Sequence, residues 1–186
     1  MRELALLTFV TLAGVMQSPK MAEEDRSGGF EGGWADPYWE PVMEMVGREA
    51  MAEPYDVLFG RKTHDLFAAN AGDNPLSGYR KYVATSRPDT LGWSNSVAIT
   101  GDIAARVAAI KQEDGPLLQV HGSCQLIQTL LAHDLVDELR LWSFPVIAGA
   151  GRRLFGDGAV AGRFRMVKTD ATDNGVVMGI YRRAGG

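Results

Sequence analysis

The strongest constraint on the fold of this chain is an alternation between two hydrophobic periods. Short apolar runs rich in β-branched and aromatic residues, typical of strands, alternate with stretches whose apolar residues recur at helical spacing. In chain order the pattern predicts β-α-β-α-β-β-α-β-α-β-β-β, which is about eight strands and about four helices. Such an order indicates an α/β protein whose mostly parallel central sheet carries helices on its faces.

The breaks between these segments give the expected bounds of each element. The strands are expected over Leu4–Thr11, Tyr55–Phe59, Lys81–Thr85, Ser96–Ile99, Leu117–Val120, Glu138–Phe144, Arg163–Thr169 and Val176–Arg182. The helices are expected to begin near Asp36, Gly60, Asp102 and Ser123, with Asp36 and Asp102 interpreted as N-caps. The turn Asp173-Asn174-Gly175 between the last two strands predicts an antiparallel C-terminal hairpin.

Length and composition favour one ordinary globular domain over residues 1–186. The single cysteine excludes an internal disulfide framework, and the three histidines lack the spacing of a metal motif, so no metal site is expected. A net charge of −4 argues against a nucleic-acid partner. The apolar segment Leu4–Met16 lacks a cleavage site and is shorter than the about 20 residues that span a bilayer. We therefore interpret it as part of a buried strand, and expect a cytoplasmic protein without a membrane segment.

Three of the expected loops follow strands directly and carry glycine or small polar residues. They are Gly60-Arg61-Lys62-Thr63, Thr85-Ser86-Arg87 and His121-Gly122-Ser123-Cys124-Gln125. Ligands of open α/β sheets bind beyond the carboxyl ends of the parallel strands, which makes these loops the candidate site. Free N–H groups at a helix start and an arginine side chain suit a phosphate group. Neither a P-loop nor a G-x-G-x-x-G dinucleotide motif is present.

Each loop also has a purely structural interpretation. The first is equally consistent with a plain strand-to-helix turn in which Arg61 and Lys62 are solvated. The second, taken alone, reads as a polar turn before Pro88. Cys124 lies at a helix start, where a thiol pKa can be lowered, but we favour a small packing residue over a nucleophile.

Several short segments, in the same order along the chain, resemble a known family. They are Thr11–Gln17, Ser27–Phe30 with Gly33-Trp34, Leu58–Thr63, Lys81–Ser86, Trp93–Ser96, Val120–Ser123, Leu135–Leu139 and Phe144–Phe155. The chain is similar to proteins of the dihydrofolate-reductase-like fold, and specifically to the C-terminal reductase domain of bacterial riboflavin deaminase–reductases. The resemblance covers nearly the whole sequence and implies a three-layer fold in a stand-alone member of that family.

The resemblance also implies a cofactor and the residues that bind it. The cofactor would be NADPH, donating hydride to a small pyrimidine- or pterin-like heterocycle. By position, the cofactor-binding residues would be Val15, Met16 and Gln17 at the nicotinamide; Gly60, Arg61, Lys62 and Thr63 at phosphates; Thr85, Ser86 and Arg87 at the 2′-phosphate and adenine; and Gly122, Ser123, Cys124, Gln125 and Leu126 at the pyrophosphate. The substrate-binding residues would be Trp34, Trp39, Phe144 and Pro145, although both tryptophans are also consistent with core or rim aromatics.

Two departures from the family pattern concern the chemistry. Relatives commonly read Leu-Asp-Gly after the first strand, whereas this chain has Leu12-Ala13-Gly14. Dihydrofolate reductases carry an acid on the first helix that assists protonation of the pterin, and the candidates here are Glu40 and Glu44. Their i, i+4 spacing favours a solvated helix face, so the catalytic residue stays unknown.

Three functions remain open from the sequence. The first is an NADPH-dependent reductase that acts on a small heterocycle, similar to 5-amino-6-(5-phosphoribosylamino)uracil reductase. The second is a reductase of another carbonyl or imine on the same fold, and the third is a non-catalytic NADPH-binding protein. The long glycine-rich segment from Gln17 to Trp34 would overhang the active site and is expected to order on cofactor binding. The apolar C-terminal strands, Val176–Tyr181 in particular, offer a surface that the resemblance implies for homodimer contacts.

Overall fold

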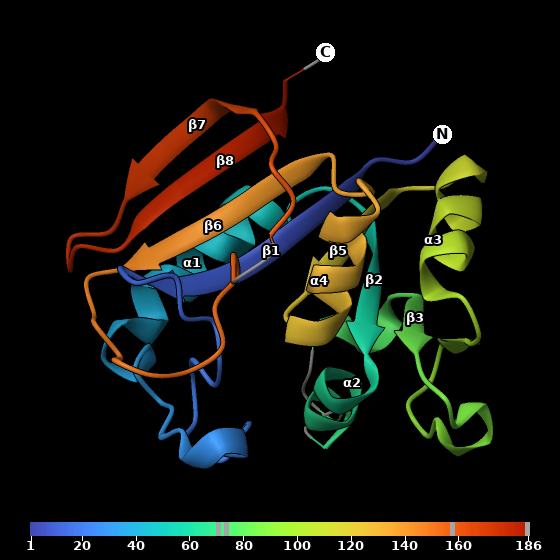
Figure 1. Ribbon diagram of the computed structural model, residues 1–186, viewed down its shortest axis with the longest axis horizontal. Coiled ribbons are helices and arrows are strands. Elements are labelled where there is room, and N and C mark those ends of the chain that lie inside the picture. The colour runs from blue at the N-terminus through green and yellow to red at the C-terminus, as the bar shows by residue number, and fades with distance from the viewer. Residues whose placement is uncertain (70–71, 73–74, 157–158, 185–186) are drawn as a thin grey trace. The chain divides into compact units, whose positions relative to one another are not determined.

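The computed structural model describes residues 1–69, 72, 75–156 and 159–184 (Figure 1). Its strands and α-helices follow one another in the expected order. The strands are β1 (Leu4–Thr11), β2 (Tyr55–Gly60), β3 (Lys81–Ala84), β4 (Ser96–Ile99), β5 (Leu117–His121), β6 (Glu138–Phe144), β7 (Phe164–Ala171) and β8 (Val177–Arg183). The helices are α1 (Trp39–Ala50), α2 (Arg61–Ala68), α3 (Ile103–Gln112) and α4 (Cys124–Ala132). Every expected strand is therefore confirmed, with bounds that differ by at most two residues.

The strands form an eight-stranded sheet in the order β4-β3-β2-β5-β1-β6-β8-β7. Strand β2 pairs in parallel with β3 and with β5, and β3 pairs in parallel with β4. Strand β8 pairs antiparallel with both β6 and β7. The mixed sheet with an antiparallel C-terminal hairpin confirms the predicted fold class. Its parallel pairs are the ones that need crossover connections, and the alternation of strands and helices in the sequence indicated such connections.

The chain divides into two compact units. Unit 1 contains residues 1–6 and 54–137, and unit 2 contains residues 7–53 and 138–186. Both units are discontinuous in sequence, and the division falls inside β1. The assignment of residues 1–186 to a single domain stays a prediction.

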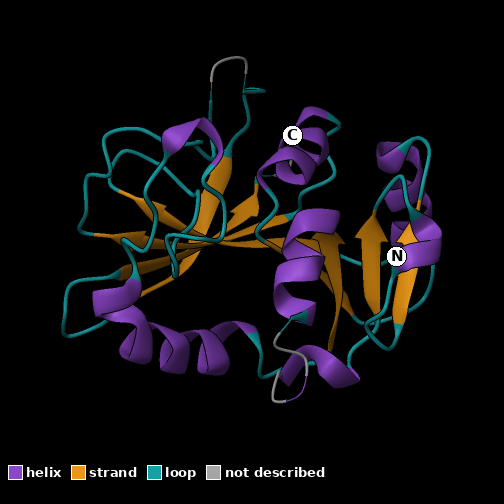
Figure 2. Cartoon of the chain, turned by 90° about the horizontal axis from the view of Figure 1, so that it is seen from below, coloured by secondary structure: helices purple, strands orange, loops and turns teal. Residues whose placement is uncertain are grey.

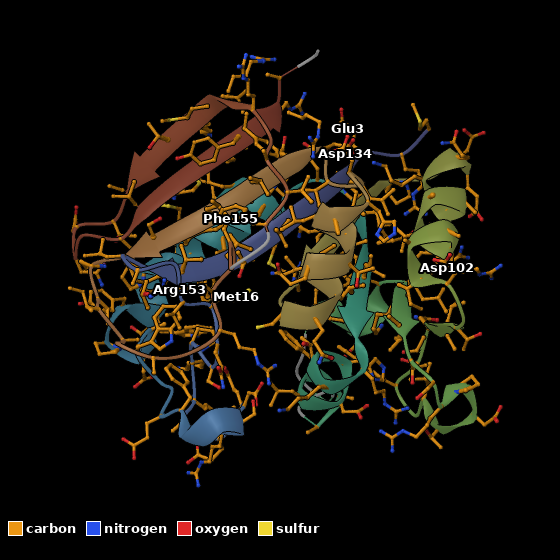
Figure 3. The ribbon with its side chains drawn as sticks, viewed as in Figure 1. Glu3, Met16, Asp102, Asp134, Arg153 and Phe155 are labelled. Carbon is orange, nitrogen blue, oxygen red and sulfur yellow. The ribbon has the colours of Figure 1, made fainter. Side chains whose placement is uncertain are left out.

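In unit 1, α3 begins where the sequence placed its cap. The Asp102 side chain accepts a hydrogen bond from the Ala105 N–H at 3.0 Å, which confirms Asp102 as an N-cap (Figure 3). Helices α2 and α4, which follow the first and the third predicted phosphate loop, both contact β2. Leu126, Ile127 and Leu130 form the buried face of α4.

In unit 2, α1 covers the antiparallel strands through a core of apolar side chains (Figure 2). The core contains Val42, Met45, Val46 and Ala50 of α1 together with Trp142, Phe144, Met178 and Ile180 of β6 and β8. These helix positions recur at i, i+3, i+4 and i+8, the spacing of one helix face. The opposite face of α1 carries Glu40 and Glu44, both exposed.

One predicted cap in unit 2 is wrong. A short 3-10 helix, η2 (Asp36–Tyr38), precedes α1, and neither it nor α1 has a side-chain cap. The Asp36 carboxylate instead pairs with the Lys20 ammonium group. The dipeptide Asp36-Pro37 does mark the start of helical backbone, but a lysine from the preceding loop competes successfully for the carboxylate.

Candidate functional site

The three predicted phosphate loops extend from neighbouring strands of unit 1 at the same edge. In the sheet register Gly60 lies opposite Ala84, and Leu58 lies opposite Val120. Because β3, β2 and β5 are parallel, the segments that follow them leave the sheet side by side. We call the segments 60–63, 85–90 and 121–126 the strand-end loops.

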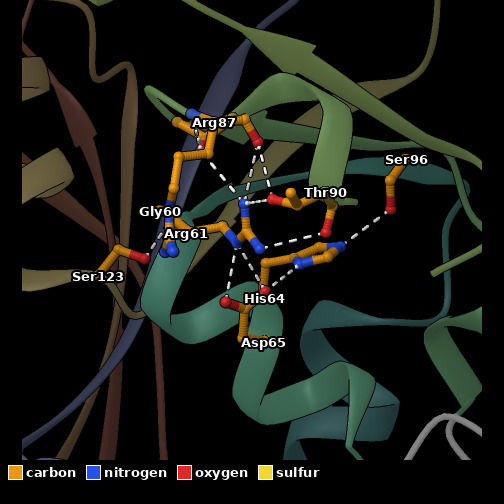
Figure 4. Close-up of polar contacts among 9 residues, drawn as sticks. Gly60, Arg61, His64, Asp65, Arg87, Thr90, Ser96 and Ser123 are labelled. Carbon is orange, nitrogen blue, oxygen red and sulfur yellow. Dashed lines mark hydrogen bonds and ion pairs between the residues drawn. The ribbon is translucent and has the colours of Figure 1, made fainter. Parts of the chain in front are cut away.

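Ser123 joins two of these loops. Its Oγ accepts a hydrogen bond from the Gly60 N–H at 2.7 Å (Figure 4). The same Oγ donates to the Thr63 Oγ1 at 2.8 Å. The contact requires a glycine at position 60, because a Cβ there would lie 2.9 Å from the Ser123 Oγ. Ser123 itself has a left-handed backbone, with φ of 71°, which a serine adopts only at a cost. The position therefore stores strain in order to aim one hydroxyl group at the neighbouring loop.

Arg61 joins the first loop to the second. Its Nη1 donates to the Thr90 Oγ1 at 2.8 Å and to the Arg87 carbonyl oxygen at 3.0 Å, and its Nη2 donates to the Thr90 carbonyl oxygen at 3.2 Å. Nη1 also lies 3.5 Å from the Thr85 Oγ1. On the same side chain, Nε contacts both carboxylate oxygens of Asp65 at 2.8 Å. The guanidinium group thus holds the loops together, a role beyond the phosphate contact that the sequence suggested.

Asp65 supports this arrangement from the first turns of α2. Its carboxylate lies 3.0 Å from the Nδ1 of the buried His64, whose Nε2 lies 3.0 Å from the Ser96 Oγ (Figure 4). Partial burial raises the pKa of the Asp65 carboxyl, but the hydrogen bonds with His64 and Arg61 outweigh it and hold the pKa below its ordinary value. Sequence reasoning missed Asp65, His64 and Thr90. The i, i+4 spacing of Arg61 and Asp65 was the only available signal for any of them.

The remaining residues predicted to bind the cofactor in unit 1 lie in or beside the strand-end loops. Ser86 and Arg87 are exposed, Thr85 is buried, and Lys62 is exposed in the first turn of α2. Gly122 has φ of 60°, and Cys124 and Gln125 open α4, with Cys124 half-buried and Gln125 exposed. Leu126 belongs to the buried face of α4. The structure therefore brings the predicted segments together, while their role in cofactor binding stays a prediction.

In unit 2, the segment predicted to face the nicotinamide is buried and paired with a distant segment. Val15 bridges to Arg153, and the Met16 N–H donates to the Arg152 carbonyl oxygen at 2.9 Å (Figure 3). Val15, Met16 and Gln17 are each at most 5% exposed. Backbone and side chains of this segment are therefore both covered by surrounding residues, and its contact with a nicotinamide stays a prediction.

The residues predicted to bind the substrate gather around an aromatic cluster in unit 2. The cluster consists of Phe9, Trp34, Tyr38, Trp39 and Phe144, with ring centroids 5.2–5.7 Å apart in edge-on pairs. Trp34 and Trp39 are half-buried, whereas Phe144 is fully buried and Pro145 is exposed. Phe144 can therefore contribute only by packing against the other rings from the protein core. The arrangement keeps both predicted interpretations of the tryptophans open, since each ring is part of the core and also reaches the surface.

Two other kinds of feature are absent from the described residues. No helix among them is long and apolar enough to cross a membrane. No group of three or more His, Cys, Asp or Glu side chains among them could hold a metal ion. The cytoplasmic location stays a prediction.

The sheet order, the four described α-helices and the strand-end loops define a class of protein, the dihydrofolate-reductase-like α/β fold. The chain belongs to the family of the RibD C-terminal domain, whose model matches residues 6–178. The resemblance stated from the sequence is therefore confirmed. Family membership and fold together support an oxidoreductase in general.

Similar proteins include two solved structures. A Shewanella sp. PV-4 protein, described provisionally as a riboflavin biosynthesis protein, has a TM-score of 0.67 and 19% identity, and the match covers 100% of both chains. Dihydrofolate reductase from Enterococcus faecalis, complexed with NADP(H) and RAB-propyl, has a TM-score of 0.63 and 15% identity, covering 98% of this chain and 97% of that one. At these identities the two structures support the fold alone.

Two proteins of Bacillus subtilis (strain 168) are similar in sequence. The uncharacterized protein YyaP is 29% identical over 136 residues, which are 67% of this chain and 72% of YyaP. The uncharacterized protein YwjB is 28% identical over 121 residues, which are 63% of this chain and 70% of YwjB. Neither relative supplies a substrate.

Proposed function

We propose that the protein is an NADPH-dependent reductase that transfers hydride to a small pyrimidine- or pterin-like heterocycle. The observation that carries the proposal is the meeting of three strand-end loops at the carboxyl edge of β3, β2 and β5, held together by Ser123 and Arg61. A dinucleotide needs several anion-binding positions at fixed spacing, and loops fixed to one another provide such spacing. The bound cofactor supplies the hydride, while the protein orients it and excludes water.

The donor set in unit 1 fits a phosphorylated nucleotide. In any α-helix the first N–H groups have no acceptor within the helix, and the helix dipole favours an anion at that end. Both properties apply to the starts of α2 and α4. Gly122, with φ of 60°, turns the backbone into α4 in a conformation that favours glycine, and a Cβ at this position would pack against the Thr63 Cγ2 at 3.6 Å. Ser86 and Arg87 are exposed beside the Arg61 contacts and suit the 2′-phosphate that distinguishes NADPH from NADH.

The aromatic cluster suits a flat heterocyclic substrate. Trp34, Tyr38 and Trp39 are half-buried, so each residue is packed against the core and also reaches the surface, where aromatic rings can bind a planar ligand. The Lys20 ammonium group lies 4.8 Å from the centre of the Trp39 ring. The same ammonium group pairs with the Asp36 carboxylate, so it holds one face of the Trp39 ring and leaves little net charge beside the cluster.

The proposal is tested by measuring NADPH and NADH binding, followed by the decay of NADPH absorbance with candidate pyrimidines and pterins. We expect saturable NADPH binding at least tenfold tighter than NADH binding. Replacement of the exposed Arg87 by alanine should remove most of that difference, and Arg106→Ala on the exposed face of α3 serves as the matched control. Absence of NADPH binding would overturn the proposal.

A second function, a non-catalytic NADPH-binding protein, is favoured by the positions of the acids. Glu40 and Glu44 are exposed on α1, and the Asp36 carboxylate is paired with Lys20. Tight NADPH binding without turnover on any heterocycle would select this function. Turnover on another carbonyl or imine would select a reductase of a different substrate on the same fold.

The predicted homodimer is also proposed, but with the sheet edge at β7 as the contact surface, because Val176, Met178 and Ile180 of the predicted segment are buried. Seven of the eight β7 residues are exposed, and they include Met166 and Val167 at 53% and 42% exposure. An exposed apolar edge strand is an association site unless it is covered. Measurement of the molar mass in solution tests the proposal, and Val167→Lys is expected to shift the protein to the monomer; a wild-type monomer at all concentrations would contradict it.

A further inference from the structure

A single buried glutamine joins three segments of unit 2. The Gln17 side chain is 2% exposed and donates from Nε2 to the carbonyl oxygens of Asp25 and Ser27, at 2.8 and 3.0 Å. Its Oε1 accepts a hydrogen bond from the Arg152 N–H at 3.0 Å. A side-chain amide has two N–H donors and one carbonyl acceptor, so both donors and the oxygen are used at once.

The side-chain partners of Gln17 belong to two segments that are far apart in the sequence. Asp25 and Ser27 belong to the glycine-rich loop, residues 17–34, and Arg152 lies on the segment that pairs with Met16. The Arg152 guanidinium group reinforces the same connection, since it lies 3.3 Å from the Asp25 carboxylate and contacts the Ser27 hydroxyl. The loop is therefore fastened at one place by both the backbone and the side chain of Arg152.

The backbone of Gln17 fixes an aromatic ring as well. Its carbonyl oxygen accepts a hydrogen bond from the Trp34 Nε1 at 2.8 Å, and Trp34 packs against Phe144 in the aromatic cluster. Gln17 thus connects the segment proposed to face the nicotinamide, the glycine-rich loop and one wall of the proposed substrate site. An apolar side chain of the same size would fill the space but make none of the three side-chain contacts.

We propose that Gln17 is a positioning residue that fastens the glycine-rich loop to the segment around Arg152 and, through the loop, keeps Trp34 in the orientation that receives the heterocycle. This inference rests on the proposed function for its effect on substrate, but its effect on the loop stands by itself. The Gln17 side chain acts on the substrate through Trp34.

The effect on the loop is tested by limited trypsin digestion, because Lys20 and Arg26 lie within the glycine-rich loop. Gln17→Met removes the amide at nearly constant volume, and Gln17→Glu turns two donor contacts into repulsion between oxygens. We expect cleavage after Arg26 to become roughly tenfold faster in Gln17→Met and faster still in Gln17→Glu. Gln112→Glu, an exposed glutamine on α3, is the matched control and should leave the rate unchanged.

A loss of global stability is distinguished from loop opening by mapping the cut sites. Loop opening exposes the bonds after Lys20 and Arg26 while the bond after Arg106 in the middle of α3 stays protected. Equal cleavage of all variants after Arg26 would overturn the inference, and so would simultaneous cleavage after Arg26 and Arg106 in the Gln17 variants alone.

The effect on the substrate is tested by comparing binding and turnover. Gln17→Met is expected to raise KM for the heterocycle about tenfold while kcat falls less, because the substrate wall is disordered and the strand-end loops are intact. NADPH affinity should change less than KM for the heterocycle, since unit 1 carries the proposed phosphate contacts and Gln17 belongs only to the segment proposed to face the nicotinamide. Absence of NADPH binding in the wild type would overturn the proposed function, whereas the digestion result would still decide the role of Gln17 in the loop. If Gln17→Met is cleaved faster after Arg26 but keeps the KM of the wild type, the role of Gln17 in substrate binding is overturned.

Discussion

Replacement of Ser123 by alanine is expected to lower the free energy of unfolding by about 1–3 kcal/mol. The alanine removes the acceptor of the Gly60 N–H, at 2.7 Å, and the partner of the Thr63 hydroxyl, at 2.8 Å. Both contacts are partly buried, so the Gly60 N–H would be left without a replacement acceptor in the protein. The larger part of the cost comes from that unpaired donor, because the Thr63 hydroxyl can rotate toward water.

Replacement of the same residue by glycine separates the hydrogen bonds from the backbone strain. Ser123 has φ of 71°, a conformation that costs an alanine about 1 kcal/mol or more and a glycine almost nothing. Ser123→Gly loses the same hydroxyl group as Ser123→Ala but gains relief of that strain. We therefore expect Ser123→Gly to be about 1 kcal/mol more stable than Ser123→Ala.

Urea unfolding of the wild type and three variants measures these differences. The third variant, Ser94→Ala, removes an exposed serine hydroxyl in the same unit and should change stability by less than about 0.5 kcal/mol. The reasoning about the Ser123 bridge would be refuted if Ser123→Ala were as stable as Ser94→Ala. If Ser123→Gly were less stable than Ser123→Ala, the argument from left-handed strain would be refuted separately.

Three further predictions concern neighbouring contacts. Arg61→Lys should not rescue the loss of stability in Arg61→Ala, because an ammonium group cannot reach Asp65, Thr90 and the Arg87 carbonyl together; equal stability of Arg61→Lys and the wild type by urea unfolding would contradict this. Because the pKa of Asp65 is lowered, its ionised carboxylate stabilises the fold at pH values above the ordinary pKa of 3.8, and this contribution is lost as the pH falls through the folded-state pKa. Between about pH 6 and about pH 3, Asp65→Asn should therefore lose less stability than the wild type. Asp102→Ala should cost about 0.5–2 kcal/mol in urea unfolding, whereas Asp36→Ala, which removes no cap, should cost less.

The order and type of the elements could be predicted because they depend on local patterns. Each strand of unit 1 is a short apolar run, and α3 has both a cap at Asp102 and an apolar face at Val107 and Ile110. These signals lie within a few residues of the element that they specify. Asp36 shows the limit of such reasoning, because its competing partner, Lys20, lies sixteen residues earlier in the chain.

The candidate site could be predicted at the level of segments but not of contacts. The rule that ligands bind at the carboxyl ends of parallel strands placed Gly60, Arg87 and Ser123 in three loops at one edge. The rule carries no information on which side chains meet. That Arg61 would turn toward the Thr90 loop, and not outward as a solvated cation, depends on the position of η5 (Pro88–Thr90).

The sequence by itself determined the α/β class, the eight strands, the antiparallel hairpin and the family resemblance, since hydrophobic period, turn residues and short motifs are all written locally. Only the tertiary structure decided the partners of the polar side chains. Ser123 meets Gly60 across sixty-three positions of sequence, and Gln17 meets Arg152 across one hundred and thirty-five. A hydrogen bond requires its two atoms to lie within about 3 Å in a favourable direction, and only the folded chain sets distances that fine between residues so far apart.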